Sequence, residues 1–367
     1  MKSLERGRRH ESLESSISRI AYAYGFTASP MPLSKKSVAD AGDIADHKTA
    51  ASMALLNGCG TAQTPTQSWG VARKTGGTTI AFAITSTRQA IAHAIIVKTA
   101  LSIAELAGYT DLSVLISSVG DLESRKRFTR ELGNFFRKNA ESMTPELKQL
   151  AAHNPDAAYR QMLREDDPVL ARAPRSIDYL SESSRKTMLS MLSLFESVGI
   201  PYVMHPRLAG EANIQSEVLF AIEGTDTHGA RTRVATGGRY DDYLKRERGK
   251  LENGIAIAVE VPERVEFEEP EEEPICFVVH VGDAAKLRSF SVLEALWRAH
   301  IAVGQALMAE NLREQMQRGG LLNPKYFAII GQREALDNTV IVRSVGTQIQ
   351  TVLPLDKLGS YVSRGHH

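Results

Sequence analysis

Apolar side chains recur at helical spacing in two stretches near the start of the chain. Leu13, Ile17 and Ile20 are spaced as on one helical face and predict a helix over residues 12–24. Residues 89–106 are rich in alanine, isoleucine and leucine, which predicts a helix that is buried over a wide face. Both segments are therefore expected to pack against other elements.

Strand patterns occur on either side of the second predicted helix. Residues 68–86 read SWGVARKTGGTTIAFAITS, in which two β-prone runs flank Gly76 and Gly77. Paired glycines between such runs predict a β-hairpin. The short apolar run Leu112–Ile116 predicts a buried strand.

The middle of the chain, residues 122–197, is mostly helical in pattern and has charged faces. Prolines break it at four places, namely Pro145, Pro155, Pro168 and Pro174. Four short segments after this region have strand patterns, and they are Tyr202–Met204, Glu217–Ile222, Thr232–Thr236 and Gly254–Val261. Strands therefore lie on both sides of a long helical stretch.

An acidic, proline-containing segment separates two parts of the chain. The sequence VPERVEFEEPEEEP is typical of a solvated spacer and predicts a linker at residues 263–274. A first domain is then expected over 1–262. Beyond the linker, strands and helices alternate, which predicts a small and largely parallel α/β domain over 275–363. Its third segment, Ala302–Met308, is expected to be a strand.

Composition excludes several classes of function. The chain has 367 residues, and its 44 basic and 43 acidic residues give a net charge of +1, which argues against strong non-specific attraction to nucleic acid. The two cysteines, Cys59 and Cys276, are far apart and have no metal-ligand spacing, so neither a metal site nor a disulfide framework is expected. No secretory signal and no run of ~20 apolar residues is present, which predicts a cytoplasmic protein that does not enter a membrane.

Several segments resemble the histidyl-tRNA synthetase family, in the order in which that family has them. The most specific is VATGGRYDDYL, residues 234–244, which is similar to the family signature AGGRYDGL. Glycines before Arg-Tyr-Asp let a backbone approach a ligand closely. Similar segments are YGFTASPMPLSKK (24–36), LISSVGDLESRKRFTREL (115–132), APRSIDYLSESSR (173–185), GIPYVMHPRL (199–208), NLREQMQRGGLLNPKYFAIIG (311–331) and NTVIVRSVGTQIQTVLPL (338–355).

The resemblance implies a fold and an assembly. It implies an α+β domain built on a class II synthetase-like antiparallel sheet with a helical insertion, followed by an α/β domain like those that bind anticodons. It also implies a homodimer, in which Pro32 lies at the interface, and possible binding of tRNA or another structured RNA. Resemblance in fold does not establish activity.

The chain departs from the family at residues that the synthetase reaction needs. In the second class II motif Arg73 matches the first arginine, but Thr75 replaces a glutamate. In the third motif Val261 replaces the arginine that contacts the ATP phosphates. In the histidine-recognition motif five positions differ, and they are Gly210, Asn213, Ile214, Gln215 and Glu217, the last in place of an arginine. Because preorganised charges stabilise the transition state, we expect no catalytic residue and no amino-acid activation.

Two sets of residues remain as candidate sites. The first is a vestigial pocket for substrate and ATP, formed by Arg73, Gly237, Gly238, Arg239 and Tyr240. Alternatively, the glycines and the tyrosine serve packing, and Arg239 pairs with Asp241 or Asp242. The second set would present amides and guanidinium groups to unstacked RNA bases, and it comprises Arg313, Gln315, Gln317, Arg318 and Arg343. The alternative for this set is an ordinary solvated helix face.

Three functions are compatible with these features. The first is a non-catalytic paralogue that binds tRNA, another RNA or a protein partner and needs no cofactor. The second is an active, divergent histidine–tRNA ligase, which would need ATP and Mg²⁺. The third is a regulatory subunit like that of ATP phosphoribosyltransferase, which also resembles this fold. The eroded histidine-recognition motif argues against the second and the third.

Overall fold

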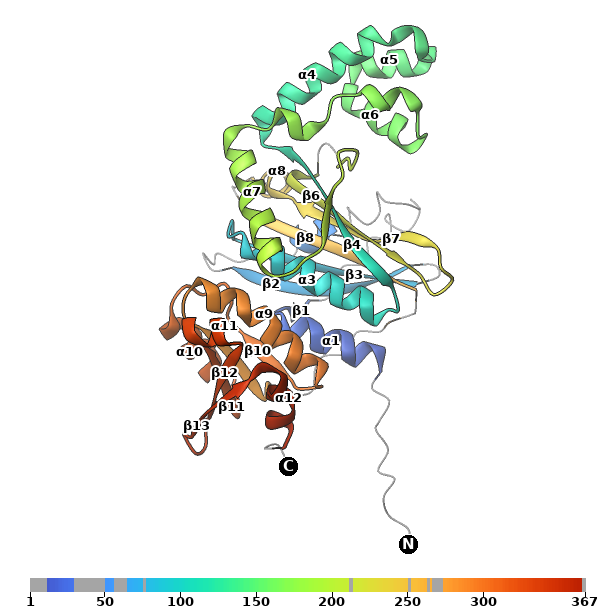
Figure 1. Ribbon diagram of the computed structural model, residues 1–367. Coiled ribbons are helices and arrows are strands. Elements are labelled where there is room, and N and C mark those ends of the chain that lie inside the picture. The colour runs from blue at the N-terminus through green and yellow to red at the C-terminus, as the bar shows by residue number, and fades with distance from the viewer. Residues whose placement is uncertain are drawn as a thin grey trace. The chain divides into compact units, whose positions relative to one another are not determined.

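The computed structural model describes residues 12–29, 50–55, 65–74, 77–210, 214–249, 252–262, 265 and 273–364. The chain forms two compact units, each with its own sheet (Figure 1). The large unit comprises Ser29–Lys74 and Thr79–Val261, and the small unit comprises Met1–Ala28, Thr75–Thr78 and Pro262–His367. Two sheet-containing units agree with the two sheet domains that the sequence predicts.

A large, mainly antiparallel sheet forms the centre of the large unit. Its strands run in the order β2-β3-β8-β7-β6-β4-β5. Their bounds are β2 (Thr66–Lys74), β3 (Gly77–Thr85), β4 (Thr110–Gly120), β5 (Tyr202–Met204), β6 (Ser216–Thr225), β7 (Arg231–Arg239) and β8 (Gly254–Val261). The pairs β4–β6, β6–β7 and β7–β8 are antiparallel, whereas β5 lies parallel to β4. Strands β2 and β3 follow one another along the chain and are neighbours in the sheet, as the hairpin pattern predicts, and residues 75–76 between them lie outside the described residues.

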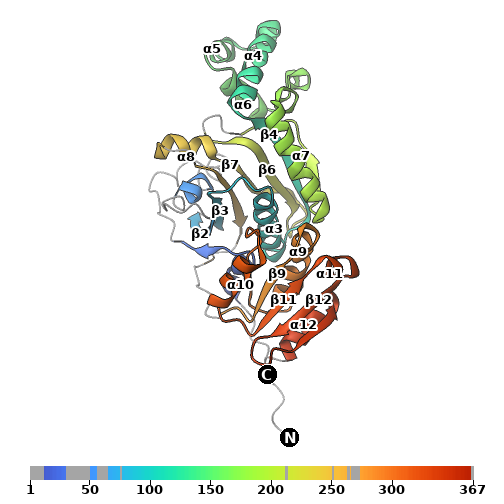
Figure 2. The same ribbon diagram turned by 90° about the vertical axis from the view of Figure 1, so that its left-hand side faces the viewer.

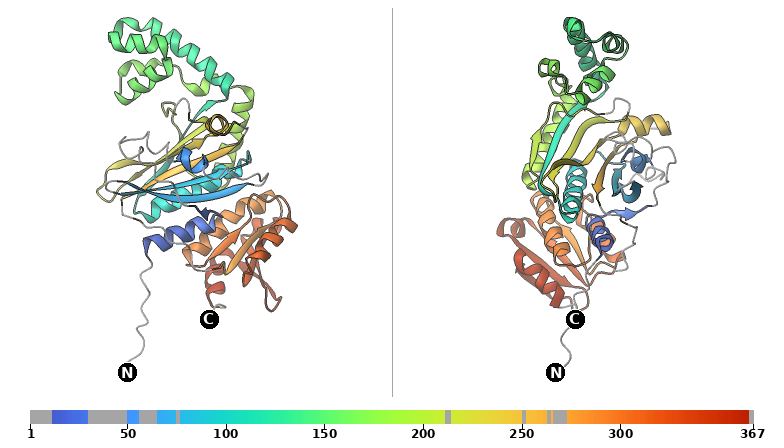
Figure 3. Two further views of the ribbon diagram at one scale, coloured as in Figure 1. Left: turned by 180° about the vertical axis from the view of Figure 1, so that it is seen from behind. Right: turned by 90° about the vertical axis from the view of Figure 1, so that its right-hand side faces the viewer.

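Helices between β4 and β5 form the predicted helical insertion. They are α4 (Leu122–Lys138), η1 (Ala140–Ser142), α5 (Pro145–His153), α6 (Pro155–Arg164), η2 (Pro168–Arg172), η3 (Ser176–Tyr179) and α7 (Glu182–Ser197). Pro145, Pro155 and Pro168 each open a helix, because the first turn needs no N–H donor there. Figure 3 shows α4, α5 and α6 grouped together, and their apolar side chains share one buried cluster around Phe128 and Leu132.

Two further helices and one helical segment cover the large sheet. Helix α3 (Ile91–Leu106) packs against β8 and α7, and α8 (Asp241–Arg248) follows directly on β7. The helical segment at residues 50–55 packs on small side chains of β3 and β8, where Ala81 and Ala256 are fully buried. Alanines at these positions let the segment lie close to the strands, so the core here is dense.

The small unit contains a five-stranded mixed sheet. Its strand order is β10-β9-β11-β12-β13, with bounds β9 (Cys276–His280), β10 (Val303–Gln305), β11 (Tyr326–Ile330), β12 (Thr339–Ser344) and β13 (Gln350–Pro354). Strands β10, β9 and β11 are parallel, but β12 and β13 are antiparallel to their neighbours. The expectation of a largely parallel domain is therefore wrong for its second half. A tight turn after Ser344 joins β12 to β13, and a tight turn can only join antiparallel strands.

The helices of the small unit lie on opposite faces of this sheet. Helices α9 (Asp283–Arg298), α11 (Gln332–Asp337) and α12 (Leu355–Arg364) pack on one another and on β9, β11 and β12 (Figure 2). Helix α10 (Leu312–Leu321) packs on β9 and β10. The unit also contains β1 (Thr27–Ala28) and α1 (Leu13–Ala23), and α1 packs on β10 and α9. The sequence-based boundary placed α1 in the first domain, whereas Gln305 Nε2 donates to the Tyr24 carbonyl at 2.7 Å within the small unit.

Strand β10 is shorter than the predicted strand at 302–308. Residues 306–309 are buried, yet they form a turn in which Ala309 N donates to the Ala306 carbonyl at 2.9 Å. A buried apolar run does not distinguish a strand from a packed turn by pattern alone. The parallel ladder therefore ends at Gln305.

Two adjacent glycines of α10 provide a test of packing in the small unit. A Cβ added at Gly319 would lie 2.7 Å from ring atoms of both Phe277 and Phe327, whereas a Cβ at Gly320 would meet no atom within 4 Å. We expect Gly319→Ala to lower the free energy of unfolding by about 1–3 kcal/mol through overpacking. Gly320→Ala is the matched control and should raise it by up to ~1 kcal/mol, since alanine favours helix. Both changes in unfolding free energy are measured by urea unfolding in a Trp69→Phe background, in which Trp297 is the only tryptophan. Equal effects of Gly319→Ala and Gly320→Ala would contradict the close packing at Gly319.

Candidate functional site

The Gly237-Gly238 pair lies on β7, at the centre of the large sheet. A Cβ at Gly237 would lie 2.5 Å from the Ala256 carbonyl oxygen and 2.5 Å from Phe220 Cε2. A Cβ at Gly238 would lie 2.6 Å from the Val218 carbonyl oxygen. Close packing against β6 and β8 therefore accounts for both glycines.

Arg239 is the last residue of β7, and its guanidinium group contacts both a carboxylate and a backbone carbonyl. Its Nε donates to Asp241 Oδ2 at 3.1 Å, and its Nη2 donates to Asp241 Oδ1 at 3.0 Å. Nη2 also donates to the Thr87 carbonyl at 3.2 Å. Only 4% of the Arg239 side chain is exposed, so this is a buried, two-pronged ion pair. Of the two partners suggested by the sequence, Asp241 is the one that Arg239 contacts.

Groups around Arg239 fix the pair in place. Asp241 Oδ1 also accepts a hydrogen bond from Gly254 N at 2.8 Å, which ties the carboxylate to the start of β8. His93 on α3 is buried, and burial, joined by the charge of Arg239, lowers the pKa of its imidazole to about 3. His93 is therefore neutral and does not repel the Arg239 guanidinium, whose negative partner is Asp241. Tyr240 is fully buried and packs with Leu244 and Ala256.

The end of β8 is apolar where the family resemblance expects a phosphate-binding arginine. Val261 is 1% exposed, and Ala258 is equally buried. A buried aliphatic side chain offers a phosphate neither a donor nor a charge. Arg73 lies on β2, but its side chain is outside the described residues, as are Thr75 and Asn213.

The segment that resembles a histidine-recognition motif is packed against β7. Gln215 is buried, and its Nε2 donates to the Gly237 carbonyl at 3.1 Å. A Cβ at Gly210 would lie 2.6 Å from Gln215 Oε1 and 2.9 Å from Leu219 Cδ2. A side chain at position 210 would therefore have to displace the ends of the Gln215 and Leu219 side chains.

Glu217 places a carboxyl group where the family resemblance expects an arginine. The residue interrupts the β4–β6 and β6–β7 pairing and has a φ of 54°, a left-handed conformation that is uncommon outside glycine. Ser118 Oγ donates to its carbonyl at 2.7 Å and so supports this geometry. Burial raises the pKa of Glu217, and the carboxylates of Asp121 and Asp241 raise it further. The local field therefore disfavours additional negative charge.

Asp121, which the sequence interpretation did not single out, organises the neighbouring edge of this site. It caps α4 by accepting from Ser124 N at 2.9 Å, and it also accepts from Ser124 Oγ and Ser181 Oγ, each at 2.7 Å. The sequence signal for the cap was present, because Asp121 precedes a helical pattern directly. Its link to Ser181 spans 60 positions and has no local signature.

The five predicted RNA-binding residues of the small unit do not all have accessible side chains. Gln315 is 1% exposed, its Oε1 accepts from His280 N at 2.8 Å, and its Nε2 donates to the His280 carbonyl at 3.1 Å. This amide completes the end of β9 and cannot reach a base without breaking both bonds. Arg313 and Gln317 are exposed on α10, and Arg318 is partly exposed and paired with Glu314 at 2.6 Å.

Arg343 lies on the same face of the small sheet as α10. It is the register partner of Phe327 on the adjacent strand, and directly opposed residues point to the same face. The Phe327 ring faces Gly319 of α10. Arg343 Nη2 donates to Gln348 Oε1 across the hairpin. The structure therefore places Arg313, Gln317, Arg318 and Arg343 on one face of the small unit.

Other candidate chemistry is limited in the part of the chain that the structure describes. Cys276 is buried, and burial raises the pKa of its thiol to about 12, which keeps it unreactive; Cys59 lies outside the described residues. No cluster of three or more potential metal ligands occurs among the described residues. None of the described helices combines the length and apolar character needed to cross a bilayer.

Comparison with known proteins links both units to one family. An anticodon-binding domain model matches residues 275–364. Histidine–tRNA ligases are similar over most of the chain: that of Geobacillus sp. (strain WCH70) is 26% identical over 275 residues, or 73% of this chain and 65% of the relative. That of Geobacillus kaustophilus (strain HTA426) is 27% identical over 271 residues, or 72% of this chain and 64% of the relative. The matched region thus spans slightly less than two thirds of these relatives.

A solved structure shows the same fold. The crystal structure of apo histidyl-tRNA synthetase from S. aureus matches with a TM-score of 0.53 and 21% identity, and the match covers 99% of this chain and 100% of that chain. At this identity the likeness concerns the fold. This chain is therefore similar to histidine–tRNA ligases in sequence over most of its length, has the fold of a histidyl-tRNA synthetase, and matches an anticodon-binding domain over residues 275–364.

Proposed function

We propose that this protein does not activate histidine and acts instead by binding tRNA or another structured RNA. The buried Arg239–Asp241 pair is the main support for the loss of histidine activation. A guanidinium group that already has a two-pronged carboxylate partner and a carbonyl acceptor has few donors left for a substrate. The surviving arginine of the signature is therefore a structural residue.

Neighbouring groups support the loss of activation. Synthesis of histidyl-adenylate would bring a carboxylate and a triphosphate, with Mg²⁺, to this sheet. Val261 offers these anions no charge, and Glu217 places a carboxyl group where the family has an arginine. Removal of a single preorganised donor typically lowers a rate by ~10²–10³, and here more than one is replaced. Val261 and Glu217 therefore provide no cationic clamp for phosphate at these two positions.

The small unit supports the RNA-binding part of the proposal. Its match to an anticodon-binding domain and the common face of Arg313, Gln317, Arg318 and Arg343 favour contact with unstacked bases and phosphates. The near-zero net charge of the chain makes a local basic surface the main source of affinity. We also propose a homodimer, as the resemblance implies, although Pro32 lies outside the described residues.

Active histidine–tRNA ligase is the second candidate, because the similar proteins of Geobacillus carry that name. For this activity, cations from elsewhere would have to replace the arginines that the family has at the positions of Glu217 and Val261. Histidine-dependent exchange between ATP and pyrophosphate separates the two candidates.

RNA binding is tested by fluorescence anisotropy with labelled tRNA transcripts over a salt series. We expect the double variant Arg313→Gln/Arg318→Gln to weaken binding by about tenfold and to lower the salt slope by about two, because two phosphate contacts are lost. The matched control is Arg298→Gln on α9, an exposed arginine paired with Glu294, whose helix packs on the other sheet face. Equal effects of both changes, or no binding at moderate salt, would refute an RNA-binding role for this face.

A further inference from the structure

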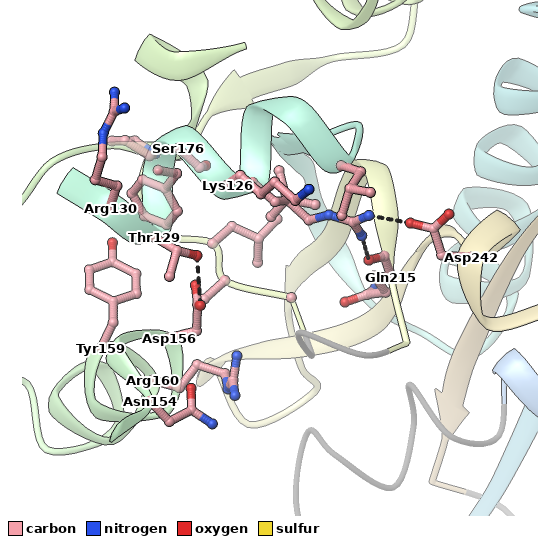
Figure 4. A pocket seen from close by; sticks show the side chains of 18 of the residues that line it. Lys126, Thr129, Arg130, Asn154, Asp156, Tyr159, Arg160, Ser176, Gln215 and Asp242 are labelled. Carbon is pink, nitrogen blue, oxygen red and sulfur yellow. Dashed lines mark hydrogen bonds and ion pairs between the residues drawn. The ribbon is translucent and has the colours of Figure 1, made fainter. Parts of the chain in front are cut away.

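A cavity of about 740 Å³ lies in the large unit, and neither Arg239 nor Asp241 is among its lining residues. Its walls come from α4, from α6, from the segment before β6 and from α8 (Figure 4). The volume falls within the range of about 300–1,000 Å³ that is usual for small-molecule sites. Nothing in the proposed RNA-binding role of the small unit uses this cavity.

Cations outnumber carboxylates in the lining. The basic side chains are Arg125, Lys126, Arg130, Arg160 and Arg246, and the acidic ones are Asp156 and Asp242. Both acids already have partners: Asp156 accepts from Thr129 Oγ1 at 2.8 Å, and Asp242 pairs with Arg125. Figure 4 shows these two interactions on opposite sides of the lining.

Among the described residues of the lining, Lys126 and Arg160 are the cations that form no ion pair, whereas Arg125, Arg130 and Arg246 each pair with a carboxylate. They come from different helices, α4 and α6. In the part of the chain that the structure describes, no carboxylate oxygen lies within 4 Å of either charged group. Two uncompensated cations on facing helices create a positive potential inside the cavity, which favours an anion. A guanidinium group beside an ammonium group suits a phosphate in particular, because the former binds two oxygens at once.

The rest of the lining is apolar and partly aromatic. Phe128 and Tyr159 stand edge to face with ring centroids 5.8 Å apart, and Leu208 lies beside them in the lining. Leu122 also lines this cavity and leaves 60% of its surface exposed. A ligand that covers Leu122 and fills the apolar part would bury this surface. The chemistry therefore calls for an apolar or ring-shaped body as well as an anionic group.

We propose that this cavity is a binding site for a small organic phosphate, in which Lys126 and Arg160 bind the phosphate and the apolar wall contacts a ring. A nucleoside monophosphate has both parts and is the probe of choice. The same chemistry occurs at the 5′-phosphorylated end of an RNA strand, and the test separates these two sources.

Isothermal titration calorimetry with adenosine 5′-monophosphate tests the proposal on the full-length protein. We expect saturable binding with a Kd of about 1 mM or below, and clearly weaker binding of both adenosine and inorganic phosphate, each of which lacks one part. Lys126→Gln and Arg160→Gln should each weaken binding by about tenfold, corresponding to the loss of one charge-assisted contact. Tryptophan fluorescence confirms that each variant is folded.

Arg127→Gln is the matched control, because Arg127 lies on α4 next to Lys126 but pairs with Glu123 and does not line the cavity. It should leave the affinity unchanged. Three outcomes would overturn the proposal: no saturable binding of the nucleotide, unchanged affinity in the Lys126→Gln and Arg160→Gln variants relative to the parent protein, or binding of a 5′-phosphorylated oligoribonucleotide alone. The calorimetric experiment tests the cavity, whereas fluorescence anisotropy with the α10 variants tests RNA binding by the small unit. Failure of the cavity proposal can therefore be distinguished from failure of the proposed function.

Discussion

Replacing Arg239 with methionine is expected to lower the free energy of unfolding of the large unit by about 3–5 kcal/mol, because the change leaves the Asp241 carboxylate buried without its partner. The measurement is urea unfolding in a Trp297→Phe background, where Trp69 on β2 is the only tryptophan and reports on this unit. Arg239→Lys should be intermediate, since an ammonium group cannot form the two-pronged contact.

An exposed pair with the same geometry serves as the control. Arg175 Nε donates to Asp178 Oδ2 at 2.9 Å and Nη2 donates to Asp178 Oδ1 at 3.0 Å, but about half of each side chain is exposed. Arg175→Met should therefore change stability little, because water screens exposed ion pairs. If Arg239→Met were as mild as this control, Arg239 would be free to serve a ligand, and the structural role assigned to it would be wrong.

Replacing Gly237 with alanine is expected to lower the free energy of unfolding of the same unit by about 3 kcal/mol, at the upper end of the range for overpacking. The added methyl group would meet the Ala256 carbonyl oxygen at 2.5 Å, and this atom cannot move without distorting the β7–β8 ladder. The Trp69 reporter again measures the change.

Gly133→Ala in α4 is the matched control for Gly237→Ala. The nearest atom to a Cβ at Gly133 is Pro155 Cγ at 4.0 Å, an ordinary contact. This change should leave stability unaltered or raise it by up to ~1 kcal/mol, because alanine favours helix over glycine. A mild effect of Gly237→Ala would indicate that open space lies beside the glycine pair, as a ligand wall would require.

The sequence predicts those features of the fold that depend on local pattern. The glycine pair marks the β2–β3 hairpin, and Pro145 and Pro155 mark the starts of α5 and α6. Helix α12 was missed although Leu355, Leu358 and Val362 are spaced as on one helical face. The turn after β10 was missed because its buried apolar residues match a strand equally well.

The candidate sites depend on contacts between residues far apart in sequence, which local sequence patterns do not reveal. The position of Gln315 on a polar helix gives no hint that its amide completes the end of β9. The choice of Asp241 over Asp242 as partner of Arg239 depends on Gly254 and Thr87, which are remote in sequence. The cavity beside Lys126 and Arg160 exists only because the insertion helices fold back towards the segment before β6.

Histidine-dependent exchange between ATP and pyrophosphate, with Mg²⁺ and a wide range of histidine concentrations, shows whether this chain activates histidine. Purified protein that is folded by tryptophan fluorescence should give no exchange above the rate without histidine. A histidine ligase run in parallel confirms that the assay works. Exchange that depends on histidine and is abolished by Glu217→Ala would contradict the account, because this chain would then hold a rebuilt catalytic site.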